Sequence, residues 1–237
     1  VLHLRRNALP KGGEVIPLTR KEIMPGVNLT YIQAKKFKTN YMSVQLSRPL
    51  DRSGATYNAL LPSVLRRGTS RYPDMQSFSR ALDLLYGARA NDVVRKKGES
   101  QCFGFAASCI DDAYAPEGGG RLLEKTAEIL GDLVCSPATK NGRFIQSYVE
   151  SEKINLIDDI RSVINDKRAY AAYRLLEEMC AGEPYGIPRL GFEKDAVGVN
   201  PMKLYRHYLE TAAKAEVELF YCGSADIYRV EGAYLSA

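Results

Sequence analysis

Two consecutive helical repeats of apolar residues, between positions 55 and 87, constrain the fold more than any other stretch of the chain. The first repeat has the three- and four-residue spacing of a helix with one buried face: Tyr57, Leu60, Leu61, Val64 and Leu65. After turn residues, a second stripe repeats the spacing and stops before a glycine: Met75, Phe78, Leu82, Leu85 and Gly87. The segment therefore predicts two antiparallel amphipathic helices.

Segments that alternate apolar and polar residues flank these helices and predict strands. Residues 27–33 and 41–48 are rich in branched or aromatic side chains, and we expect them to form adjacent antiparallel strands that lead into the first helix. Residues 88–97 and 99–110 predict two more strands around Gly98, and residues 216–222 predict a further one. The order up to residue 110 is strand, strand, helix, helix, strand, strand.

The second half of the chain is mostly helical in pattern. Apolar repeats predict helices at 121–134 and 142–163, and Pro201 opens another after the capping residue Asn200. A further helix is expected at 167–181, with one face buried through Tyr170, Tyr173, Leu176 and Met179. Between the strands and these helices lies a run of three glycines at 118–120. It lacks the Gly-Lys-Ser/Thr ending of a phosphate loop, so we interpret it as a connection.

The charge and the apolar distribution argue against two classes of protein. The net charge of +5 is mild, and the basic runs are scattered over different elements with no nucleic-acid-binding motif beside them. No stretch has the length and apolar content of a membrane span, and the first residues lack the apolar core of a secretory signal. We therefore expect no nucleic-acid partner, no membrane contact and a cytoplasmic location.

The cysteines and histidines also limit the chemistry. Five cysteines lie far apart, with neither paired spacing nor an even number, which indicates buried apolar residues in a reducing compartment: Cys102, Cys109, Cys135, Cys180 and Cys222. The two histidines, His3 and His207, share no helical register with another ligand. A two-histidine metal site on one helix is therefore excluded.

Short motifs in the first half of the chain resemble the first domain of the pitrilysin/insulinase family of inverted zinc metallopeptidases, particularly non-catalytic bacterial homologues. They are Leu65-Arg-Arg-Gly-Thr69, Tyr72-Pro73, Leu82-Asp-Leu-Leu-Tyr-Gly-Ala88 and Lys96-Lys-Gly-Glu99, and the loop Gly182-Glu-Pro-Tyr-Gly186 adds to the resemblance. Active members carry His-x-x-Glu-His on the first helix, where the histidines bind zinc and the glutamate is the general base. Here the three positions are Ala59, Pro62 and Ser63. None can take over these roles, because alanine and proline have no suitable side-chain donor or base and serine is a poor neutral ligand.

Two further positions of the family lie on the helix expected at 142–163. Active relatives place a glutamate there, and seven residues later a second glutamate that is the third zinc ligand. The corresponding residues here are Glu152 and Asp159. A separation of seven is almost two helical turns, so we expect both carboxylates to point the same way along with Leu156.

The resemblance implies a fold and a division of the chain. It implies an α+β class, as a two-layer sandwich of a mostly antiparallel sheet with helices packed on one face. The peptidase-like domain is expected at 27–223, after an extended lead-in at 1–26, and 224–237 would begin a following helix or a linker to an absent second domain. Because a full subunit of the family holds two related domains, the chain looks like the first of two.

Three functions remain open at this stage. The first is a catalytically inactive, zinc-less domain that contributes to a peptide-binding chamber, takes extended peptides and pairs as a heterodimer with a catalytic homologous peptidase subunit. The second is an active hydrolase with a rearranged site at Glu152, Asp159 and Ser63, and the third is a stand-alone peptide-binding scaffold. For the first we expect no zinc cofactor, no proteolysis by the chain alone, and substrate contact through a sheet edge.

Overall fold

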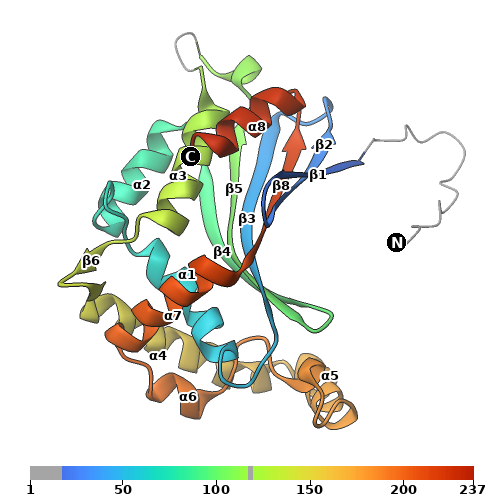
Figure 1. Cartoon of the computed structure of the whole chain (residues 1–237), viewed down its shortest axis with the longest axis vertical. Coiled ribbons are helices and arrows are strands. Elements are labelled where there is room, and N and C mark those ends of the chain that lie inside the picture. Colours follow the sequence, from blue (N-terminus) through green and yellow to red (C-terminus); the bar gives the residue numbers. More distant parts are fainter. Residues whose placement is uncertain (1–17, 117–119) are drawn as a thin grey trace, which may run out of the picture.

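Helices cover one face of a six-stranded sheet in the computed structural model, which describes residues 18–116 and 120–237 (Figure 1). The sheet strands are β1 (Leu18–Met24), β2 (Val27–Gln33), β3 (Thr39–Pro49), β4 (Arg89–Lys97), β5 (Ser100–Ile110) and β8 (Glu216–Gly223). A separate hairpin joins β6 (Thr139–Lys140) to β7 (Arg143–Phe144). The helices are α1 (Ala55–Arg66), α2 (Met75–Leu84), α3 (Leu122–Cys135), α4 (Gln146–Ser162), α5 (Lys167–Met179), α6 (Glu193–Val197), α7 (Pro201–Lys214) and α8 (Ile227–Leu235). The expected α+β two-layer class is confirmed.

The spatial order of the strands is β1-β2-β8-β3-β5-β4. The pairs are antiparallel except for β2 and β8, which run parallel. The expectation that β2 and β3 are neighbours is wrong, because β8 lies between them and places Leu219 opposite both Leu29 and Val44. Alternation in a strand shows which side chains are buried and carries no information on which strand pairs with it.

The core lies between the sheet and α1, α3 and α8, and α7 packs against α1. Met42, Val44 and Leu46 of β3 point into it, as the alternation predicts, and each is at most 8% exposed. The stripe of α1 packs against them through residues that are almost fully buried: Leu60, Leu61, Val64 and Leu65. The burial of these apolar side chains is the main favourable contribution to the stability of the fold, at roughly 25 cal/mol per Å² of apolar surface removed from water.

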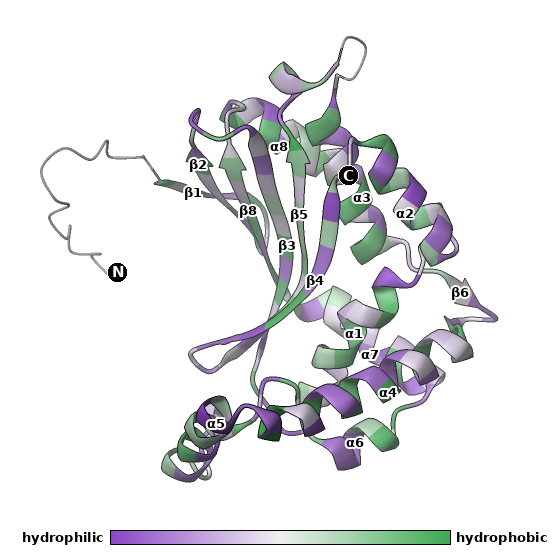
Figure 2. Cartoon of the chain, turned by 180° about the vertical axis from the view of Figure 1, so that it is seen from behind, coloured by the Kyte–Doolittle hydropathy of each residue, from purple (hydrophilic) through white to green (hydrophobic). Residues whose placement is uncertain are grey.

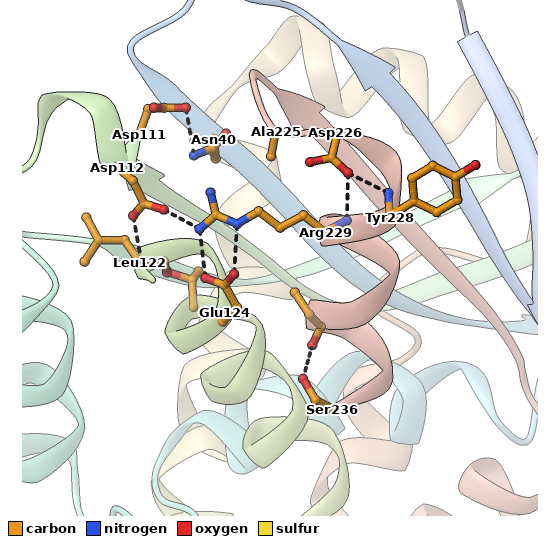
Figure 3. Close-up of polar contacts among 12 residues, drawn as sticks. Asn40, Asp111, Asp112, Leu122, Glu124, Ala225, Asp226, Tyr228, Arg229 and Ser236 are labelled. Carbon is orange, nitrogen blue, oxygen red and sulfur yellow. Dashed lines mark hydrogen bonds and ion pairs between the residues drawn. The ribbon is translucent and has the colours of Figure 1, made fainter. Parts of the chain in front are cut away.

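The segments on either side of the expected domain also take part in this unit. β1 pairs with β2 along the sheet edge, although residues 18–24 fall in the expected lead-in. α8, in the expected linker, buries Val230 and Ala233. Its Arg229 donates hydrogen bonds to both oxygens of Glu124, at 2.8 and 2.9 Å, and also pairs with Asp112 (Figure 3). This guanidinium fixes the last helix to the start of α3.

α5 differs from its prediction in burial. Asp166 caps its start, since the backbone N–H of Ala169 donates to the Asp166 carboxylate at 3.0 Å. However, no residue of α5 is buried, Met179 is 69% exposed, and Leu176 is only half-buried. α5 lies apart from the helices that cover the sheet (Figures 1 and 2). Apolar periodicity predicts an amphipathic helix, but it does not show that the same chain supplies the surface that would cover it.

Smaller differences concern boundaries and exposure. The helix expected from residue 142 begins at Gln146, because the preceding residues form the β6–β7 hairpin.

All five cysteines are free. Cys102 and Cys109 are buried as expected, whereas Cys135 is exposed and the remaining two are half-buried, so the expectation of burial is wrong for Cys135. His3 and the glycines at 118 and 119 lie outside the described residues. Within the described residues, no helix combines the length and apolar character needed to cross a bilayer.

Candidate functional site

The three motif positions of α1 lie close to the sheet. Ala59 is 3% exposed and Pro62 is buried, so both belong to the packed face of the helix. Ser63 is half-buried, and its hydroxyl donates to Oδ2 of Asp92 on β4 at 3.1 Å. The serine oxygen is therefore engaged with a carboxylate.

Glu152 on α4 is held by an arginine from the end of α1. Arg67 donates to Oε1 of Glu152 and, through a second nitrogen, to Oγ of Ser151 at 2.7 Å. Asn155 donates to Oε2 of Glu152 at 3.1 Å. The Glu152 side chain is only 13% exposed. Both of its oxygens are thus occupied, and its negative charge is balanced by Arg67.

Asp159 does not join Glu152 in a carboxylate pair. It is exposed, while Glu152 and Leu156 face the protein. The seven-residue spacing on one continuous helix still places both residues on the same side of α4, so they differ in burial and not in direction. Seven residues correspond to a shift of about 10 Å along the helix axis as well as nearly two turns. The two carboxylates thus lie at different depths, and only that of Glu152 is covered by α1.

The site does not fit a zinc ion. Two of the three α1 positions have no donor atom, and the hydroxyl of Ser63 is turned to Asp92. Across residues 18–116 and 120–237, no group of three or more His, Cys, Asp or Glu side chains is placed to hold a metal ion. We therefore derive no step of chemistry through zinc.

A chain of polar side chains crosses the core behind the motif helix. Gln101 donates through its amide nitrogen to the carbonyls of Ala55 and Arg189, at 3.0 and 2.8 Å. Its oxygen therefore accepts from Nδ2 of Asn58, at 3.0 Å, which leaves Oδ1 of Asn58 as an acceptor. Nε2 of His207 lies 2.7 Å from that oxygen, so this nitrogen must carry the hydrogen. His207 thus has a structural partner.

This arrangement predicts a dependence of stability on pH. Burial lowers the pKa of His207 below 6.5, and Arg48 lowers it further, whereas Glu210 and Asp51 oppose the shift. The folded state therefore binds the proton less readily than the unfolded chain, so stability is present above about pH 6.5 and is lost as the pH falls. We expect the urea midpoint to fall between pH 7.5 and 5.5, as the free energy of unfolding decreases by no more than about 1.4 kcal/mol per pH unit.

His207→Gln is the matched variant for this prediction, because its amide can still donate to Asn58 and does not titrate. The decline in stability over this pH range should be shallower in the variant than in the wild type. An identical decline in both proteins would show that other groups cause it.

The outer edge of β4 runs beside the motif helix, and its backbone directions follow from two hydrogen bonds. Leu50 N donates to Glu99 O at 2.8 Å, and Asp111 N donates to Lys38 O at 2.9 Å. Together they show that the odd-numbered residues of β5 turn their backbone groups toward β3 and the even-numbered ones toward β4. On β4, the N–H and C=O groups of Ala90, Asp92, Val94 and Lys96 consequently point away from the sheet. No strand of the described part of the chain pairs with this edge.

The segment after α5 covers one end of this edge. Arg189 donates to the outward carbonyl of Val94 at 3.3 Å. Nζ of Lys96 donates to the carbonyls of Tyr185 and Ile187, at 2.7 and 3.1 Å. The backbone groups of Ala90 and Asp92 lie on the other half of the edge, where Ala90 is buried and Asp92 is partly exposed next to Ser63. The accessible part of β4 at Asp92 therefore adjoins the motif positions of α1.

The sequence did not indicate the residues that form hydrogen bonds or ion pairs with Ser63, Glu152 and Asn58. Asp92 is a lone acidic residue in a strand, and Gln101 is a lone amide in an apolar strand. Neither has a spacing that indicates its partner. Arg67 lies within the quoted Leu65-to-Thr69 motif, but its contact with Glu152 spans 85 positions and requires the fold.

Solved structures share this architecture. A conserved protein from Enterococcus faecalis V583 superposes with a TM-score of 0.83 at 24% identity, over 92% of this chain and 51% of that one. The peptidase M16 inactive domain from Pseudomonas fluorescens gives 0.69 at 13% identity, over 93% and 50%. The chain therefore shares the fold of these two structures, one of which is an M16 peptidase domain.

A sequence relationship narrows this class. The chain is 33% identical over 208 residues, 88% of its length, to the "Probable inactive metalloprotease YmfF" of Bacillus subtilis (strain 168), and it spans 49% of that relative. No protein-family model matches the chain. By its fold and this relative, the chain resembles a non-catalytic first domain of the M16, or pitrilysin/insulinase, family. It spans about half the length of the relatives it matches.

Proposed function

We propose that the chain is a catalytically inactive, zinc-less metallopeptidase-like domain that forms part of a peptide-binding chamber. In this proposal it pairs with a catalytic homologous subunit, and an extended peptide adds to the sheet as an extra strand. The observation that carries the proposal is the outer edge of β4. Its outward backbone groups at Asp92, which is partly exposed, adjoin a motif helix that has no metal ligands. Backbone pairing at a sheet edge provides affinity without metal chemistry.

The length of the relatives supports the pairing part of the proposal. Since the chain spans about half of each, we propose that it is the first of two related domains and that residues 27–223 are its central part. A wall of the chamber contributed by one domain requires a second wall, which a homologous domain or subunit would supply. The five free cysteines agree with a reducing, cytoplasmic location for this assembly.

The geometry gives less support to the alternative of a rearranged hydrolase. Ser63 donates its hydrogen to Asp92, and no histidine of the described residues lies between them to act as a base, since His207 bonds to Asn58. Glu152 is ion-paired with Arg67, and Asp159 lies apart from both. The three candidate residues therefore do not converge on one reacting position.

A proline in the open edge tests the peptide-binding proposal. Asp92→Pro removes an outward N–H that a bound strand would need, and prolines are tolerated at edges. The probe is an uncharged, fluorescein-labelled ten-residue peptide of alternating valine and serine. We expect its affinity, measured by fluorescence anisotropy, to fall about tenfold or more relative to wild type.

Asp92→Ala is the matched control, because it loses the same contacts with Ser63 and Arg66 but keeps the backbone N–H. It should bind the peptide within about twofold of wild type. Equal affinities for the proline and alanine variants, both folded by circular dichroism, would contradict pairing at this edge. So would a wild-type chain that does not bind the peptide.

A further inference from the structure

A cavity of about 960 Å³ lies between α5 and the segment 180–193 that follows it. This volume is in the range of ligand-binding sites. Much of its wall is apolar or aromatic, with Ile160 and Val163 at one end, Tyr170 and Tyr173 on α5, and Leu190 and Phe192 on the following segment. The otherwise uncovered helix α5 thus forms one side of a concave surface.

The charged residues around the cavity are predominantly acidic. Five carboxylates line it, whereas only two guanidinium groups do: Asp51, Glu177, Glu178, Glu183 and Glu193 against Arg174 and Arg189. The chain as a whole has the opposite sign, with a formal net charge of +5. The side chains that line the cavity thus differ in sign from the chain as a whole and complement a cation, although two basic side chains lie at its border, Arg52 over the ring of Phe192 and Lys96 over that of Tyr185.

Internal ion pairs compensate part of this charge. Arg174 pairs with both Glu177 and Glu178, and Glu193 pairs with Arg161 outside the cavity. Glu183 is exposed and has no ion pair within the described residues. One arginine is therefore shared by two glutamates on the wall, and Glu183 is free to meet an incoming cation.

The cavity lies in line with the edge of β4. Its wall residues Ile187 and Arg189 are the ones whose backbone and side chain contact Lys96 and Val94. A peptide that runs along the edge of β4 from Asp92 toward Val94 would therefore meet this segment and then the cavity.

We propose that the cavity receives the end of a bound peptide that carries an apolar side chain next to a lysine or arginine. This inference rests on the proposed function and assigns the class of peptide. The apolar side chain packs between α5 and Leu190, and the cation lies against Glu183 and the carboxylates around Arg174. Affinity for such peptides should decrease with salt, because the acidic wall is partly exposed.

Two labelled peptides test the inference on the 237-residue chain. One has the sequence Lys-Phe-Gly-Lys-Leu-Gly-Lys-Phe, and the other has glutamine at each lysine. We expect the basic peptide to bind at least about tenfold more tightly in low salt. Glu183→Gln should weaken the basic peptide about threefold and leave the neutral one unchanged.

Arg174→Gln should have the opposite effect, because it releases two glutamates from their shared partner. We expect the basic peptide to bind about threefold more tightly to this variant. Lys167→Gln is the control, since it removes a cation from the same exposed helix away from the cavity, and it should change the affinity less. Tyr173→Ser should weaken both peptides through the loss of apolar contact.

These experiments distinguish a failure of the cavity inference from a failure of the proposed peptide binding at the β4 edge. If Asp92→Pro abolishes binding but Glu183→Gln and Arg174→Gln leave the basic peptide unaffected, the cavity inference is wrong and edge pairing stands. An equal increase in affinity for the basic peptide in Arg174→Gln and Lys167→Gln would also contradict binding of the cation in the cavity. If neither peptide binds the wild-type chain, both proposals fail.

Discussion

Gly104→Ala should destabilise the protein by about 4 kcal/mol, which sums the typical costs of backbone strain and of overpacking. Gly104 lies in the middle of β5, with φ at +150°, a conformation that side-chain-bearing residues rarely adopt. A Cβ atom there would lie 2.2 Å from the carbonyl oxygen of Val44 and 3.0 Å from Cα of Gln45. Both belong to the backbone of β3, so relief requires two central strands to move apart.

Urea unfolding followed by circular dichroism measures this effect, and Gly232→Ala serves as the control. A Cβ at Gly232, inside α8, meets nothing within 4 Å, so this change should be neutral or stabilise by up to about 1 kcal/mol. Since small domains are stable by only about 5–15 kcal/mol, the two variants should be clearly separated. A loss below about 1 kcal/mol for Gly104→Ala would show that β3 and β5 are not packed this closely.

Gly191→Ala should cost about 3 kcal/mol, because strain and a clash again combine. Its φ is +72°, and a Cβ would lie 2.6 Å from both the backbone nitrogen and Cα of Thr56. Thr56 is fully buried at the start of α1, and its hydroxyl accepts from Phe192 N at 3.0 Å. The variant should therefore detach the segment after α5 from α1 as well as lower the urea midpoint.

Gly182→Ala is the matched control at the other end of that segment. Its φ is also positive, at +87°, but a Cβ would meet nothing within 4 Å. It should lose only about 1 kcal/mol, the cost of the left-handed backbone. If both variants lost the same free energy of unfolding, the left-handed backbone alone would explain the effect. The close approach to Thr56 would then not be its cause.

Much of the fold follows from patterns that lie within single segments. The stripe of α1 and the alternation of Met42, Val44 and Leu46 report local burial, and Asn200 caps α7 as expected through Lys203 N at 2.9 Å. The position of β8 could not be predicted, because its pairing with β2 joins residues 190 positions apart and leaves no trace in either strand. The family resemblance predicted the class of fold, and the apolar periodicity predicted the helices and strands.

The candidate site also has features that the sequence predicts and features that it does not. The absence of ligands at Ala59, Pro62 and Ser63 can be predicted from the sequence, since side-chain chemistry alone decides it. What replaces them could not be predicted. The partners of Ser63 and Glu152 come from β4 and from the end of α1, and long-range contacts of single charged residues have no periodic signal. The exposure of α5 was missed for a related reason, because amphipathicity does not identify the covering surface.

The central place of β8 also determines when this molecule can acquire its structure during synthesis. β2 and β3 leave the ribosome early, yet the strand that bridges them is made after residue 215. Until then the nascent chain holds two sheet fragments with unpaired inner edges, which are sites for intermolecular aggregation. Protection by chaperones should therefore matter most late in translation, and closure of a loop of such length should make folding slow.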